Sequence, residues 1–143
     1  MSAYLEWLLR LAGAGLILLA FMHVPIGRVM KWREEAARMS PFNAEVFHVH
    51  TFFVCLVLVI MGLPSLIEPR IFLDPSRAGG WLAWSIAGFW AVRLYFQWFV
   101  YSPKLWRGKR RETFMHGLFT VIWTSLVAVF GLCGLIQAGW LRP

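Results

Sequence analysis

The chain has 143 residues, of which 59% are hydrophobic and 15% charged, and its formal net charge is +7. Ordinary soluble domains carry about 25% charged residues, so this composition excludes that class and indicates an integral membrane protein. We expect a single membrane domain over residues 1–143, because four spans of about 20 residues with short loops use the whole length.

Four apolar segments are long enough to cross roughly 30 Å of hydrocarbon as helices. The first has neither the basic start nor the small-residue cleavage pattern of a signal peptide, so we interpret it as a retained helix. Because the connections are short, the sequence predicts an all-α fold, an antiparallel bundle of four transmembrane helices. The predicted spans cover about residues 4–26, 44–67, 80–101 and 114–137.

The connection between the first two spans, residues 27–39, is polar but has an apolar stripe. This pattern predicts a short amphipathic helix lying at the membrane interface. Ser40 and Pro41 are typical of an N-cap and a first helical position, and Glu68-Pro69 closes the second span. The stripe consists of Val29, Trp32, Ala36 and Met39.

Basic residues are distributed unevenly between the two sides of the predicted membrane domain. Nine lie in the loops on one side and three on the other. The positive-inside rule therefore makes the first side cytoplasmic and places both termini outside. We expect the membrane to be a bacterial inner membrane. The positive charge therefore reflects topology and does not indicate nucleic-acid binding. The nine are Arg28, Lys31, Arg33, Arg38, Lys104, Arg107, Lys109, Arg110 and Arg111, and the three are Arg70, Arg77 and Arg142.

The two cysteines are predicted to lie at different depths in the bilayer. Cys55 is nearer the cytoplasmic side than Cys133, by about 15 Å at 1.5 Å per helical residue. A disulfide needs Cα atoms within about 7 Å, so we expect both thiols to be free.

All four histidines lie near the predicted cytoplasmic ends of their spans. Helical periodicity directs His23, His48 and His116 into the bundle. It directs His50 to the opposite side of its helix, toward lipid, the headgroups or a partner chain. Ionisable groups are costly within a membrane and usually mark function there, so this layer is the predicted functional site.

The third span contributes a polar stripe to the same layer. Arg93, Gln97 and Tyr101 share one helix face, and the long side chain of Arg93 can reach toward the histidines. The predicted constellation comprises His23, Glu45, His48, Arg93, Gln97, Tyr101, Glu112 and His116.

One hypothesis for this layer is a b-type haem with a role in membrane electron transfer. Two of His23, His48 and His116 would be the axial ligands. Arg93 would meet a propionate, and Gln97 and Tyr101 would complete the polar lining of the cofactor site.

A second hypothesis is a non-haem iron, zinc or copper site of a membrane enzyme. Glu45 and His48 are three residues apart, and Glu112 and His116 are four apart, so each pair shares a helix face. His23 could complete the ligand set. A full di-iron site would need further carboxylates, which the predicted bundle interior lacks.

A third hypothesis needs no metal. The layer could be a proton or ion relay, or a pocket for a quinone, a lipid headgroup or another lipophilic small molecule. A non-enzymatic accessory subunit, a homo-oligomer or a larger membrane complex fits the composition equally, as do histidines that only bind interfacial water. The sequence has no phosphate loop, nucleophile elbow or His-Glu-x-x-His motif, and it leaves these hypotheses open.

Overall fold

The structure is a computed structural model and describes residues 2–141. It is all-helical, with 85% helix and no strand in the described range. Its chain contacts divide it into two units, which we call unit 1 (residues 1–8 and 70–143) and unit 2 (residues 9–69). The elements are α1 (Ser2–Val29), α2 (Trp32–Ala36), α3 (Pro41–Ile67), η1 (Pro69–Phe72), α4 (Arg77–Tyr95), η2 (Phe96–Val100), η3 (Pro103–Leu105) and α5 (Arg110–Gln137).

Three of these helices are long and apolar enough to cross a membrane: Ala3–Val29, Pro41–Ile67 and Arg110–Gln137. The predicted all-α membrane class is therefore supported. The region of the predicted third span is helical, as α4 and η2, but it is not among the helices that are long and apolar enough to cross a membrane. A four-helix antiparallel membrane bundle is not confirmed and stays a prediction.

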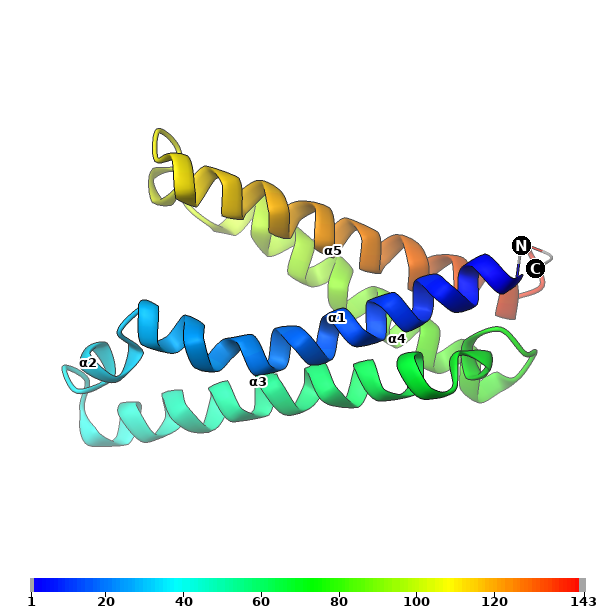
Figure 1. Cartoon of the computed structure of the whole chain (residues 1–143), viewed down its shortest axis with the longest axis horizontal. Helices are drawn as coiled ribbons and strands as arrows, with labels where there is room; N and C mark the ends of the chain where they lie inside the picture. The colour runs from blue at the N-terminus through cyan, green and yellow to red at the C-terminus, as the bar shows by residue number, and fades with distance from the viewer. Residues whose placement is uncertain (1, 142–143) are drawn as a thin grey trace. The chain divides into compact units, whose positions relative to one another are not determined.

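In unit 2, α1 and α3 lie side by side (Figure 1). Their backbones approach closely at Gly13 and Gly62: a Cβ atom added to Gly62 would lie 2.8 Å from the carbonyl oxygen of Gly13. Small residues permit such close approach, which gives membrane helices their packing contacts. Near this contact the Arg10 guanidinium donates to the carbonyl of Leu66, in the last turn of α3, where a cation is favourable.

The predicted start and end of the second span are confirmed. Asn43 N donates to Ser40 Oγ at 3.4 Å, so Ser40 is the N-cap of α3, and Pro41 is its first residue. α3 ends at Ile67, with Glu68 as its C-cap.

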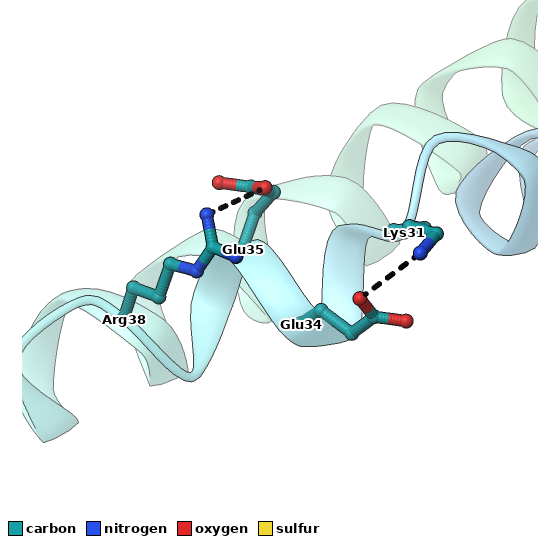
Figure 2. Close-up of polar contacts among 4 residues, drawn as sticks. All are labelled: Lys31, Glu34, Glu35 and Arg38. Carbon is teal, nitrogen blue, oxygen red and sulfur yellow. Dashed lines mark hydrogen bonds and ion pairs between the residues drawn. The ribbon is translucent and has the colours of Figure 1, made fainter.

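The interfacial helix is shorter than the predicted stretch. α1 continues to Val29, and Lys31 then adopts a left-handed conformation with φ 54°, so α2 has only 5 residues. Two glutamates of α2 form exposed ion pairs with cations that lie just outside the helix: Glu34 with Lys31 at 3.4 Å and Glu35 with Arg38 at 3.3 Å (Figure 2). Exposed pairs of this kind add little stability.

In unit 1, α4 and α5 lie side by side (Figure 1). They pack closely because small residues face large ones: a Cβ atom added to Gly134 would lie 2.6 Å from the Trp84 ring. The buried α4 residues recur at three- and four-residue spacing, as one face of a helix requires. They are Gly79, Ala83, Ile86, Ala87, Trp90 and Leu94.

The loop before α4 is tied to the end of α5 by one side chain. Gln137 Oε1 accepts from Ser76 N at 2.8 Å, and Gln137 Nε2 donates to the carbonyls of Asp74 at 2.8 Å and Ile71 at 3.4 Å. Elsewhere in the chain both cysteines are free, as predicted, and Cys133 is buried.

Candidate functional site

The helix that begins as α4 changes its pitch just where its polar residues lie. The turn η2 is π-helical, and within it Gln97 is buried, with 4% of its surface exposed. Single π-helical turns are uncommon and occur frequently at functional sites. Here the turn contains a buried polar side chain.

Gln97 joins Arg93 to His116 on the neighbouring helix. Arg93 Nη1 donates to Gln97 Oε1 at 3.2 Å, and Gln97 Nε2 lies 3.0 Å from Nδ1 of His116. The same amide nitrogen also donates to the backbone carbonyl of His116 at 3.3 Å. Four of the residues predicted for the site, namely Arg93, Gln97, Tyr101 and His116, thus belong to one set of contacts in unit 1.

Aromatic rings enclose these polar groups. The Arg93 guanidinium lies 5.3 Å from the ring centroid of Tyr101 and 5.2 Å from that of Trp123. Trp123 in turn stacks on Trp90, with centroids 4.6 Å apart and planes 12° apart. Trp106 stacks on the His116 ring at 4.3 Å. Cation–π contacts of this kind stabilise a cation within a poorly solvated region.

The polar groups around His116 are mostly hydrogen-bond donors. The indole nitrogens of Trp90, Trp106 and Trp123 are buried and have no hydrogen-bond partner. Arg93 has no carboxylate partner among the described residues of unit 1. A guanidinium has five N–H donors, and Gln97 accepts from one of its nitrogens. The site therefore has more donors than the protein supplies with acceptors.

A groove of about 350 Å³ opens beside Arg93. Its walls are largely apolar, and Arg93 is the one charged residue among those that line it. The lining residues are Gly88, Phe89, Val92, Arg93, Phe96 and Tyr101.

The other predicted histidines lie in unit 2. His23 is half-buried, and its Nδ1 donates to the carbonyl of Leu19 at 2.8 Å. Its ring neighbours Trp32 at 6.2 Å, and Trp32 in turn contacts Phe47, which contacts His48. His48 itself is exposed.

His50 was set apart by the periodicity, and it too is exposed. Its Nδ1 donates to the carbonyl of Val46 at 2.8 Å, a local contact within its own helix.

The carboxylates predicted as metal ligands, Glu45 and Glu112, are both exposed. Within residues 2–141 no three His, Cys, Asp or Glu side chains come together in a group that could hold a metal ion. The structure thus gives no support to the predicted set of His23, Glu45, His48, Glu112 and His116 as a metal site.

No protein-family model, curated protein or solved structure matches this chain.

Proposed function

We propose that this chain is a four-span membrane protein that binds an anionic phospholipid beside Arg93. In addition to α1, α3 and α5, the proposed spans include α4 together with η2, which continue as one helix from Arg77 to Val100. This length meets the requirement of about 20 residues for crossing a bilayer. Tryptophan and glycine lower its hydropathy, yet both are common in membrane helices. With four spans, the basic loops are cytoplasmic and both termini lie outside.

The observation that carries the proposal is Arg93, a cation without a carboxylate partner among the described residues of its unit, with the unpaired indole donors of Trp123 and Trp90 near it. Burying an unpaired charge in a low-dielectric region is costly, and an anion beside it removes much of that cost. A ligand rich in acceptor oxygens would meet both needs.

The groove favours an anion that carries an acyl chain. Phe89, Val92 and Phe96 form an apolar wall against which an acyl chain can pack. Arg93, in the same groove, can bind the anionic headgroup. Arginine binds phosphate through paired, charge-assisted hydrogen bonds. Its side chain also extends toward Tyr101, near the end of the helix, and so toward the depth of the bilayer phosphates. The occupant we assign is therefore a phospholipid of the surrounding bilayer.

Native mass spectrometry and thermal unfolding of detergent-purified protein test this assignment. We expect phosphatidylglycerol to be retained and to raise the unfolding midpoint by about 5 °C at a large excess over its dissociation constant. Phosphatidylcholine should do neither. Arg93→Gln should abolish the difference between the two lipids, whereas Arg110→Gln, which changes an exposed cation at the start of α5, should preserve it. Equal binding of both lipids, or stabilisation by a short-chain quinone alone, would contradict the proposal.

A b-type haem is the second candidate, and His23 is the observation in its favour. Because its Nδ1–H donates to Leu19, the lone pair of Nε2 is available, as in an axial ligand. His48 in the same unit is the second histidine that could serve. When bound, such a haem would supply one-electron redox chemistry. We assign no axial role to His116, because its Nδ1 lies 3.0 Å from the Gln97 amide nitrogen.

An optical spectrum separates this candidate from lipid binding. Haem-reconstituted protein should show a Soret band and, on reduction, an α-band, and both should be lost in His23→Ala but kept in His50→Ala. If wild-type protein reconstituted with haem shows neither band, the second candidate is rejected.

A further inference from the structure

We infer that Gln97 holds His116 as the neutral tautomer protonated on Nε2, and that this pair in turn positions Arg93 at the groove. The inference deepens the proposed function and rests on it, because it assigns positioning residues to the Arg93 site. It follows from the orientation of one amide group.

Two independent contacts fix which end of the Gln97 amide faces which neighbour. The guanidinium of Arg93 can only donate, so the atom facing it must be the acceptor Oε1. The backbone carbonyl of His116 can only accept, so the atom facing it, 3.3 Å away, must be the donor Nε2. Turning the amide over would place two donors together at Arg93 and two acceptors together at His116.

With the amide fixed, the protonation of the imidazole follows. Gln97 Nε2 carries two hydrogens, and its second contact is Nδ1 of His116 at 3.0 Å. That nitrogen must therefore accept, which leaves the proton on Nε2 and the ring neutral. A protonated Nδ1 would oppose the amide hydrogen and break the chain of hydrogen bonds.

The surroundings of His116 hold the ring in this position. Trp106 stacks on it with an interplanar angle of 10°, and Arg107 lies over Trp106 at 5.8 Å. The two cations nearest in this set of contacts are Arg93, which donates to Gln97, and Arg107, which lies over Trp106, and neither would favour an imidazolium. Glu112, one turn earlier on α5, is exposed and makes no ion pair within the described residues.

Two consequences follow for the site. His116 acts through Gln97 on the direction of the Arg93 guanidinium, so both are positioning residues for the bound phosphate. In addition, while the hydrogen-bond chain holds, Nε2 offers a hydrogen and no lone pair, so His116 receives an oxygen acceptor rather than a metal ion.

Nitrogen-15 NMR of the full chain in lipid nanodiscs tests the tautomer without any added ligand. With ¹⁵N-histidine labelling and His116→Gln to identify the signal, we expect an unprotonated Nδ1 and a protonated Nε2. Gln97→Glu replaces the amide by a carboxylate of the same shape and should move the proton to Nδ1. A wild-type His116 protonated on Nδ1, or on both nitrogens at neutral pH, would overturn the inference.

Lipid affinity tests the positioning role. Gln97→Leu should weaken phosphatidylglycerol binding about tenfold, because a hydrogen bond to a charged group is lost. Thr124→Val, which removes an exposed hydroxyl from α5, should have no effect. Unchanged affinity in Gln97→Leu would refute positioning. If wild-type protein shows the expected tautomer but binds no phosphatidylglycerol, the proposed function fails, while the orientation of Gln97 and His116 stands.

Discussion

The indole ring of Trp106 and the imidazole ring of His116 are stacked, with centroids 4.3 Å apart. Trp106 follows the short η3 turn, and His116 lies in the second turn of α5. The stack therefore fixes the loop between α4 and α5 onto the candidate site. It also covers one face of the histidine that Gln97 contacts.

We predict that Trp106→Leu destabilises the protein by about 1 kcal/mol, the usual size of an aromatic pair beyond its apolar burial. Thermal unfolding in detergent measures this change. Trp98→Leu provides the control, because Trp98 is 53% exposed and should tolerate the change. An equal loss in both variants would show that the stacking itself contributes nothing.

Gln137 is the second side chain whose loss should destabilise unit 1. Gln137→Leu removes its hydrogen bonds to Ser76, Asp74 and Ile71, and we expect a cost of about 1–3 kcal/mol. Hydrogen exchange should rise at residues 71–76 and stay unchanged in the middle of α5. Gln137→Glu keeps the acceptor for Ser76 N but turns a carboxylate oxygen toward the carbonyls of Asp74 and Ile71, so it should not restore the stability. Equal exchange in wild type and Gln137→Leu would contradict this role.

The contact between α1 and α3 yields a prediction for unit 2. A Cβ atom at position 13 would lie 2.6 Å from both the Gly62 oxygen and the Leu66 nitrogen, so Gly13→Ala forces two backbones apart and should cost about 1–3 kcal/mol. Gly15→Ala is the matched control, because nothing lies within 4 Å of a Cβ there. If the two variants unfold at the same temperature, this close approach does not hold the helices together.

Helical periodicity was sufficient to predict the helices and several of their ends. Ser40, Pro41 and Glu68 are local signals, and each lies where the sequence predicted a helix boundary. The interfacial helix was overestimated, because its stripe is equally compatible with a continuation of α1 to Val29 and a short α2. An apolar stripe shows which face of a helix is apolar, but it does not show where the helix ends. The end depends on single residues such as Lys31, whose left-handed conformation interrupts the helix.

The candidate site was predictable only where its members share a helix face. Arg93, Gln97 and Tyr101 were placed together by spacing alone. Spacing did not place Trp106 at the site, because its stack on His116 depends on how the loop folds back. The unpaired indole nitrogens and the orientation of the Gln97 amide depend on contacts between helices, which periodicity does not specify.

Membrane topology provides the last prediction, because the number of spans determines where two loops lie. If α4 and η2 cross the bilayer, Asp74 and Lys109 lie on opposite sides. If only α1, α3 and α5 cross, both loops lie on the same side, since no span separates them. We expect a membrane-impermeant thiol reagent added outside intact cells to label Asp74→Cys and to leave Lys109→Cys unlabelled until the membrane is opened. Wild-type protein, with Cys55 and Cys133 inside predicted spans, gives the background. Equal labelling of both positions in intact cells would show that α4 and η2 do not cross the bilayer. It would thereby also rule out a bilayer lipid in contact with Arg93.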